Sequence, residues 1–361
     1  MQKRRLGRTN LQVSIVGFGG TWISELTSSE AVGVVKRAFD LDINYFDTAK
    51  LDGDSEEKIG AAFQDVRDKC IIATKTGSRT KKESLEDVKC SLKRLKTDKL
   101  DIIQLHGIDD EKTLSKAMSP DGSLQTCKEA RKQGLVDFIG ITGHKPRVLV
   151  KAVESGEFDT VLIPLNVVTR QALEDLLPAA NAHDVGVIVM KPLSAKTSTL
   201  ITCLYNPSLS LVSDEPELKA LLGKNTDGMV DNALRYVLSQ DIATVIPGLR
   251  SIQEVETAVK SAEQYIGLTT REKNQFSFNL GEKFCRDCGQ CLPCHQNINI
   301  AAILRFHTLY EVYRLKVWAK KLYNGLEIKG DKCTECGICE LKCPYKLSIA
   351  SMVKKADSEL Q

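Results

Sequence analysis

The chain has 361 residues and a net charge of +3, with 42% hydrophobic and 27% charged residues. This is the composition of a globular protein, and the length suits one large domain plus a smaller one. So small a net charge argues against nucleic-acid binding. No apolar run approaches the roughly 20 residues of a membrane helix, and the first residues lack a signal-peptide core. We therefore expect a cytoplasmic protein without nucleic-acid or membrane partners.

Eight short runs rich in β-branched residues recur over the first two thirds of the chain. They are LQVSIVGFGG, INYFDTA, CIIATK, LDIIQLHG, VDFIGITGH, TVLIPLN, GVIVMKPL and ATVIPG. Segments with helical periodicity, such as SSEAVGVVKRAFDLD, separate most of them. Apolar strands joined by helices predict a parallel sheet covered by helices. Eight such units favour a closed (β/α)₈ TIM barrel, an α/β fold, over an open sheet. We expect the barrel to span residues 1–275.

One connection in this predicted barrel is long, from Ser194 to about Gly228, and has little periodicity. It follows the seventh strand, so it should lie at the carboxyl-terminal mouth of the barrel. Long loops in that position often act as lids, and disorder is the alternative.

Eight of the twelve cysteines lie in two dense runs within residues 276–361, which we expect to form a small, mainly helical, ferredoxin-like domain. The runs are Cys285, Cys288, Cys291 and Cys294, and then Cys333, Cys336, Cys339 and Cys343. The second run has the C-x₂-C-x₂-C-x₃-C-P spacing of bacterial ferredoxins, in which the fourth thiolate reaches the other cluster. We therefore predict two [4Fe–4S] clusters.

Zinc is one alternative for the cysteine runs, but a tetrahedral zinc site needs only four ligands, usually as two separated pairs. A second is haem c attachment, which C-x-x-C-H at residues 291–295 matches; it would leave Cys285 and Cys288 unexplained. The first run also departs from the ferredoxin spacing, since its last gap is two residues and His295 stands where proline is usual. Which cluster Cys294 serves is therefore open.

Three titratable residues follow successive predicted strands: Asp47, Lys75 and His106. Active sites of such barrels lie at the carboxyl ends of the strands, so the three side chains should converge on one pocket. A buried polar set of this kind destabilises a fold unless its members are paired or functional. The sequence therefore predicts an active site at this mouth.

The motifs FDTA, ATK, SLKRLKTDKLDIIQLH, IGITGH and MKPL resemble the aldo-keto reductase family over residues 3–266. The cysteine-rich tail resembles the ferredoxin-tailed branch of that family. The resemblance implies NADPH-dependent carbonyl reduction by an Asp, Tyr, Lys and His set, of which Asp47, Lys75 and His106 match three. Asp52 stands in the place of the tyrosine, the family's general acid. A free aspartic acid has a pKa of about 3.9, whereas imidazole titrates near neutrality, so His106 is the alternative acid.

The resemblance also implies a site for a nicotinamide cofactor, in which Arg250 and Ser251 could contact the adenosine 2′-phosphate. The residues that match it are Thr142, His144, Asn166, Lys191, Gly248, Arg250 and Ser251. Glu254 stands where the family often has arginine, which weakens the expectation of NADP or NAD. A flavin bound through the mouth loops would leave no motif.

Three functions are compatible with these features. In the first, the barrel binds a small organic substrate, the clusters supply single electrons from an electron-transfer partner, and Asp47, Asp52, Lys75 and His106 manage protons. The second is an NAD(P)H-dependent reductase with His106 or water as the acid. The third is a non-catalytic barrel with clusters that carry electrons or act as a sensor. We favour the first, because it explains both the clusters and the missing tyrosine.

Overall fold

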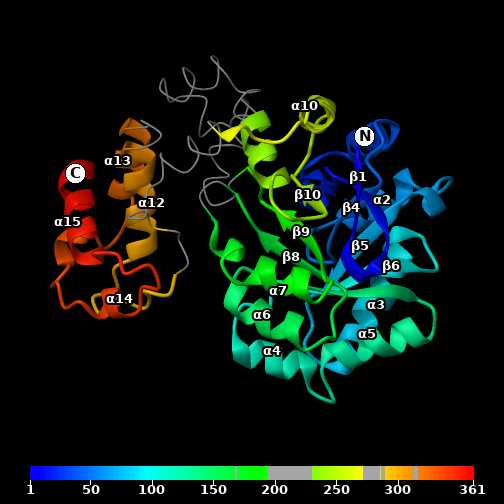
Figure 1. Cartoon of the computed structure of the whole chain (residues 1–361), viewed down its shortest axis with the longest axis horizontal. Helices are drawn as coiled ribbons and strands as arrows, with labels where there is room; N and C mark the ends of the chain where they lie inside the picture. The colour runs from blue at the N-terminus through cyan, green and yellow to red at the C-terminus, as the bar shows by residue number, and fades with distance from the viewer. Residues whose placement is uncertain (167–168, 194–229, 271–284, 286–288, 312–315) are drawn as a thin grey trace. The chain divides into compact units, whose positions relative to one another are not determined.

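The computed structural model describes residues 1–166, 169–193, 230–270, 285, 289–311 and 316–361 (Figure 1). These residues divide into two compact units, one with residues 1–193 and 230–268 and the other with the described residues from 269 onward. The long connection that we expected from Ser194 to Gly228 lies outside the described residues.

Eight parallel strands form a barrel in the first unit (Figure 1). They are β3 (Phe18–Gly19), β4 (Tyr45–Asp47), β5 (Ile71–Thr76), β6 (Leu100–Leu105), β7 (Val136–Thr142), β8 (Thr160–Pro164), β9 (Gly186–Met190) and β10 (Thr244–Ile246). Their order in the sheet follows the chain, and parallel bridges between Val16 and Val245 and between Gly19 and Gly248 close the sheet. The predicted (β/α)₈ barrel is confirmed.

Helices connect the strands and cover the outside of the barrel (Figure 1). They are α1 (Ser28–Asp40), α2 (Ser55–Ala62), α3 (Lys81–Leu95), α4 (Glu111–Met118), α5 (Ser123–Lys132), α6 (Pro146–Glu154), α7 (Leu176–Ala182) and α10 (Ile252–Glu263). Local sequence fixes where several of them begin. In α1, the Thr27 side chain accepts from the Glu30 backbone N–H while the Glu30 carboxylate accepts from the Thr27 N–H, a capping box.

An antiparallel hairpin, β1 (Lys3–Arg5) and β2 (Gln12–Ser14), was not predicted. The first expected strand, LQVSIVGFGG, is instead divided between β2 and β3. The hairpin covers the amino-terminal ends of the barrel strands: Leu6 is buried in the barrel core, and the Arg4 guanidinium donates to the Ile242 carbonyl just before β10, at 3.0 Å. The opposite, carboxyl-terminal mouth is where the candidate site residues lie.

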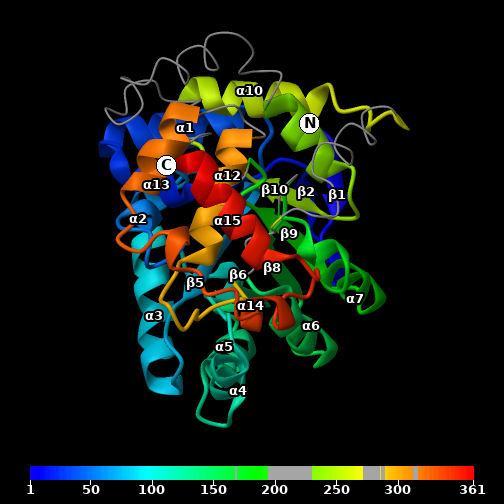
Figure 2. The same ribbon diagram turned by 90° about the vertical axis from the view of Figure 1, so that its left-hand side faces the viewer.

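The second unit is helical, with α12 (Ile300–Glu311), α13 (Lys316–Asn324), α14 (Ile338–Leu341) and α15 (Ile349–Leu360). The helices α12 and α15 lie side by side (Figure 2), and α13 packs against both. Their shared core contains Ile303, Trp318, Tyr323 and Val353. None of the helices in the described parts of the chain is both long enough and apolar enough for a membrane crossing.

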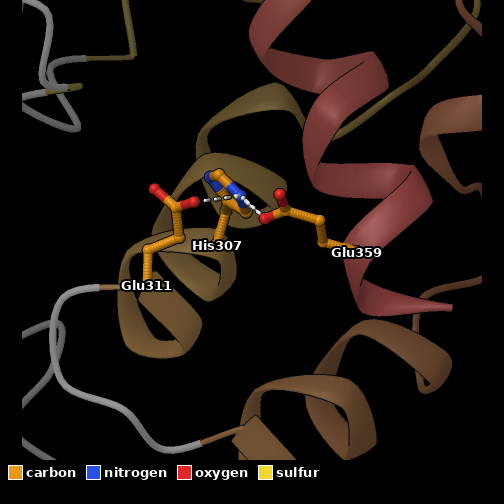
Figure 3. A group of neighbouring side chains, drawn as sticks. All are labelled: His307, Glu311 and Glu359. Atoms are coloured by element: carbon orange, nitrogen blue, oxygen red, sulfur yellow. Dashed lines mark hydrogen bonds and ion pairs between the residues drawn. The ribbon is translucent and has the colours of Figure 1, made fainter.

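A charged cluster joins α12 to α15 in this unit (Figure 3). The Nε2 atom of His307 lies 2.6 Å from a carboxylate oxygen of Glu359 and 4.0 Å from one of Glu311. These groups could hold a metal ion, but the Lys355 ammonium lies 2.6 Å from the same Glu311 oxygen. We interpret the cluster as a network of polar contacts that holds α15 against α12.

Candidate active site and cysteine clusters

A buried ion pair lies at the barrel mouth, where β4 and β5 end. The Lys75 ammonium donates to the Asp47 carboxylate and, at 2.7 Å, to the Thr48 carbonyl. Gln104, the neighbour of Lys75 in the β5–β6 register, donates to the other Asp47 oxygen at 2.8 Å. Asp47 and Lys75 are each only 5% exposed. Burial raises the pKa of Asp47, while the Lys75 charge and the hydrogen bonds from Lys75 and Gln104 oppose that rise.

Gln104 was missed in the sequence analysis, although a signal for it existed. Side chains alternate along a strand, so a polar residue two positions before His106 shares its face. In LDIIQLHG it is the one uncharged polar residue before His106. The position of Gln104 therefore predicts a hydrogen bond to a polar residue at the end of a neighbouring strand.

His106 follows β6, and its half-buried ring is neutral at physiological pH. Burial, together with the charges of Lys75 and Arg79, lowers the pKa of His106 to about 4. Only on the order of 0.1% of the rings would then be protonated at pH 7. Its Nδ1 atom is buried and has no hydrogen-bond partner within the described parts of the chain. This weighs against our expectation that His106 could replace the tyrosine as general acid.

Arg79 holds the turn that carries His106. Its guanidinium donates to the backbone carbonyls of His106 and Gly107, and to the Gly77 carbonyl at 2.8 Å. Both the position and the protonation state of the ring therefore depend on this arginine, which the sequence analysis did not select.

We expect the depressed His106 pKa to make the barrel sensitive to acid. The folded-state pKa lies below the ordinary value of 6.5, so the stability is fully present above pH 6.5 and is lost as the pH falls toward 4. A shift of this size corresponds to about 3 kcal/mol. His106→Gln should therefore show a smaller drop in melting temperature between pH 7 and pH 5 than the native protein. Equal drops would contradict the assignment, as would an NMR titration of the His106 ring near pH 6.5.

Asp52 lies on the loop between β4 and α2, and it is half-buried. Its carboxylate accepts a hydrogen bond from the Thr21 hydroxyl at 3.1 Å. It also lies close enough to Asp47 for its charge to raise the pKa of Asp47. In this arrangement Asp52 acts as a hydrogen-bond acceptor, and its expected role in proton transfer stays a prediction.

Three of the residues expected at the nicotinamide, His144, Asn166 and Lys191, form a network at the ends of β7, β8 and β9. The Lys191 ammonium lies 2.9 Å from His144 Nε2, and His144 Nδ1 lies 3.2 Å from a carboxylate oxygen of Asp109. The Asn166 amide donates to the Lys191 carbonyl at 3.0 Å. Thr142 ends β7 and is buried. Asp109 was not predicted from the sequence.

The remaining expected cofactor residues lie after β10. Gly248 packs directly against Trp22, because a Cβ atom at Gly248 would stand 2.2 Å from the Trp22 ring. The Arg250 guanidinium lies 5.9 Å from the centre of the same ring and 3.6 Å from a Glu25 carboxylate oxygen. Arg250 is 8% exposed, so it is buried between an aromatic ring and an acid.

At the N-terminus of α10, where we expected a nucleotide 2′-phosphate, the Glu254 side chain accepts the available hydrogen bond. The Glu254 carboxylate accepts from the Arg250 backbone N–H at 2.8 Å and lies 3.7 Å from the Arg250 guanidinium. The Ser251 hydroxyl caps the helix by accepting from the Glu254 N–H. Glu254 is 3% exposed, and burial raises its pKa. The Glu254 carboxylate already pairs with the Arg250 N–H and guanidinium, the groups that a 2′-phosphate would use. The residues present therefore do not fit a 2′-phosphate.

The cysteines of the second unit fall into two groups, each drawn from both runs. One cavity, of about 300 Å³, is lined by Cys291, Cys294, Cys333, Cys336 and Cys339. Another is lined by Cys285, Cys291 and Cys343. Cys288 lies outside the described residues. Cys294 therefore lies with three cysteines of the second run, and Cys343 lies with cysteines of the first.

Two glycines beside these cysteines have a backbone conformation that allows close approach to a cluster. Gly289 and Gly337 adopt φ angles of +72° and +73°, which favour glycine and let the backbone turn closely. His295, which stands where proline is usual, lies 3.6 Å from Cys336 Sγ and 3.3 Å from the Thr334 hydroxyl. The thiol donor sets in both cavities fit iron–sulfur clusters.

Comparisons with protein families match the two parts of the chain separately. The family model described as "Aldo/keto reductase family" matches residues 15–274. The model described as "4Fe-4S dicluster domain" matches residues 284–348.

Individual relatives agree with the first of these matches. A Bacillus subtilis (strain 168) protein named "Uncharacterized oxidoreductase YqkF" is 29% identical over 290 residues, which cover 73% of this chain and 91% of the relative. The L-galactose dehydrogenase of Arabidopsis thaliana is 31% identical over 294 residues, 73% of this chain and 89% of the relative.

Solved structures show the same barrel. The aldo-keto reductase AKR11C1 from Bacillus halodurans, in its holo form, is 27% identical with a TM-score of 0.61, over 76% of this chain and 95% of that one. An aldo-keto reductase from Klebsiella pneumoniae in complex with NADPH has a TM-score of 0.59 at 20% identity, over 76% of this chain and 93% of that one, and it shares the fold. The chain therefore belongs to the aldo/keto reductase family, as an oxidoreductase with a C-terminal 4Fe-4S domain.

Proposed function

We propose that the protein is an iron–sulfur oxidoreductase in which the barrel mouth binds a small organic substrate and two [4Fe–4S] clusters supply the electrons singly. Cysteines of both runs line each of two cavities, Cys291 lying between them, and this arrangement carries the proposal. One cluster would be held by Cys294, Cys333, Cys336 and Cys339, and the other by Cys285, Cys288, Cys291 and Cys343. When bound, such clusters transfer one electron at a time, and their potentials depend on hydrogen bonds and solvent exposure.

The barrel residues have separate tasks in this proposal. The Asp47–Lys75 pair, held by Gln104, keeps a fixed dipole at the mouth, which can orient a polar substrate group without reorganisation. Among the residues that the structure describes, Nδ1 of the neutral His106 ring has no hydrogen-bond partner, so the ring keeps hydrogen-bonding capacity for a substrate. Two electrons and two protons convert a carbonyl group into an alcohol. An electron-transfer protein would refill the clusters.

Two alternatives have less support. An NAD(P)H-dependent reductase needs a proton donor other than His106, and with NADPH it also needs a phosphate site where Glu254 lies. A non-catalytic barrel would leave the buried Asp47–Lys75 pair without a purpose, although such pairs do not in general stabilise a fold better than apolar residues.

Iron and sulfide analysis of protein purified without oxygen tests the proposal. We expect about eight iron atoms per chain. Cys294→Ser should damage one cluster and leave the absorbance and iron of the other, whereas Cys90→Ser, outside both runs, should change neither. Zinc without labile sulfide would contradict the clusters. After dithionite reduction, re-oxidation by a carbonyl compound supports the relay, while bleaching of oxidised clusters by NADPH favours the reductase instead.

A further inference from the structure

We propose that Asp109, His144 and Lys191 form the proton-donating chain of the barrel, with the Lys191 ammonium giving the proton to the substrate. The three residues come from the loops after β6, β7 and β9, so they meet at the same mouth as Asp47, Lys75 and His106. The inference deepens the proposed function and rests on its placement of the substrate at this mouth.

The hydrogen bonds fix the direction of the chain. Asp109 accepts twice from His144, from its backbone N–H and from ring Nδ1 at 3.2 Å. With Nδ1 as a donor, the neutral ring presents Nε2 as an acceptor, and the Lys191 ammonium lies 2.9 Å from that atom. An acid that orients an imidazole in this way selects its tautomer. Lys191 is therefore the member of the chain that carries the transferable proton.

The backbone of Lys191 is held in an unusual conformation. Its φ angle is +59°, in the left-handed region that a lysine rarely adopts. The Asn166 amide donates to the Lys191 carbonyl and accepts from the Thr169 N–H at 2.8 Å. Strained residues persist where neighbouring contacts fix them, and they concentrate at functional sites. Asn166, which we expected at a nicotinamide, thereby positions the lysine.

Other titratable groups at the barrel mouth are less suited than Lys191 to donate a proton to the substrate. Lys75 is bound in the ion pair with Asp47 and to the Thr48 carbonyl. His106 is neutral at pH 7 because its pKa is about 4, and the Asp52 carboxylate accepts from Thr21. An ordinary lysine ammonium has a pKa of about 10.4 and an ordinary tyrosine about 10, so the two acids have similar strength.

Charges from several elements face this chain. Burial raises the pKa of Asp109, but the hydrogen bonds from His144 and the charge of Lys145 oppose that effect, and the pKa is lowered. The charge of Arg79 faces Asp109 from the loop after β5. Asp109 therefore stays ionised and continues to orient the ring.

Reduction of a carbonyl group to an alcohol needs two electrons and two protons, and the reduced clusters would supply the electrons. As a carbonyl substrate takes up two electrons, its oxygen becomes basic, the N–H bond of Lys191 breaks and an O–H bond forms. The carbonyl carbon takes the second proton from solvent, and the product is an alcohol. The Lys191 amine then regains a proton from solvent through His144 Nε2.

Turnover by the dithionite-reduced holoprotein tests this with three probes: benzaldehyde, glyceraldehyde and methylglyoxal. Lys191→Met should lower kcat by about 100-fold or more, with a smaller change in KM. Asp109→Asn should lower kcat less, because it weakens the hydrogen bonds that orient the His144 ring and leaves Lys191 in place. Lys151→Met removes the same charge from the barrel surface and should leave the rate unchanged. A Lys191→Met variant with the native rate would overturn the proposal alone, whereas a native protein inactive on every probe would overturn it together with the proposed function.

The His144 ring gives a readout that is independent of turnover. In ¹⁵N-labelled holoprotein, NMR should show the proton on Nδ1, and Lys191→Met should shift the Nε2 resonance. A proton on Nε2, or spectra that Lys191→Met leaves unchanged, would overturn the proposal. The Lys151→Met spectra serve as the control.

Discussion

Replacing Lys75 by methionine is expected to destabilise the barrel by about 3–5 kcal/mol, because breaking a buried ion pair leaves an uncompensated charge. The substitution removes the ammonium that neutralises Asp47, while the carboxylate stays 5% exposed. Within the described residues, the Gln104 amide is the side-chain donor that would still reach that carboxylate. The same change removes the bond to the Thr48 carbonyl, which joins β5 to the loop after β4.

Thermal unfolding followed by circular dichroism measures this effect. A loss of this size corresponds to a fall of roughly 6–20 °C in melting temperature for a barrel of this length. Lys81→Met is the matched control: its partner Glu129 is exposed, and such pairs contribute about 0–1 kcal/mol. Asp47→Asn combined with Lys75→Met should recover part of the loss, because the unpaired charge is gone. A Lys75→Met effect no larger than the control would contradict our account of the pair.

The barrel could be predicted from the sequence because its eight strands are runs of β-branched residues between helical segments. The hairpin could not, since Lys3, Arg4 and Arg5 form β1 without any apolar residue. Its stability comes from contacts distant in sequence, such as the bond from Arg4 to the Ile242 carbonyl. Local patterns contain no information on contacts of this kind.

The residues of the candidate site also include some that the sequence predicts and some that it does not. Asp47 and Lys75 could be brought together from strand ends alone, because neighbouring parallel strands end at the same edge. Gln104 and Asp109 depend on strand register and loop shape, and the first of these was detectable only through side-chain alternation. The cluster partner of Cys294 depends on how the chain returns after α13, which spacing within one run does not determine.

One departure from the family could be read from the sequence, but its consequence could not. Glu254 was recognised as a residue where arginine is common. That its carboxylate turns back onto the backbone N–H of Arg250 is a property of the folded loop. The substitution therefore does more than remove a positive charge, because it places an internal anion on the donors that a phosphate would use.

Replacing Glu254 by glutamine is expected to tighten NADPH binding by about tenfold or more, since a like charge placed against a ligand costs up to several kcal/mol and 1.4 kcal/mol is a factor of ten. Glutamine keeps an oxygen that can accept from the Arg250 N–H, so the loop should be preserved. NADH lacks the 2′-phosphate, so its affinity should change little. Glu254→Arg should favour NADPH further.

Quenching of tryptophan fluorescence can measure these affinities, because Trp22 lies beside Arg250. The control is Glu256→Gln on the same helix, where the carboxylate is half exposed and paired with Arg37. The control should bind NADPH as weakly as the native protein. Native protein that binds NADPH more tightly than NADH would show that Glu254 does not exclude the phosphate. Equal NADPH affinities in Glu254→Gln and the control would contradict the prediction that Glu254 weakens NADPH binding.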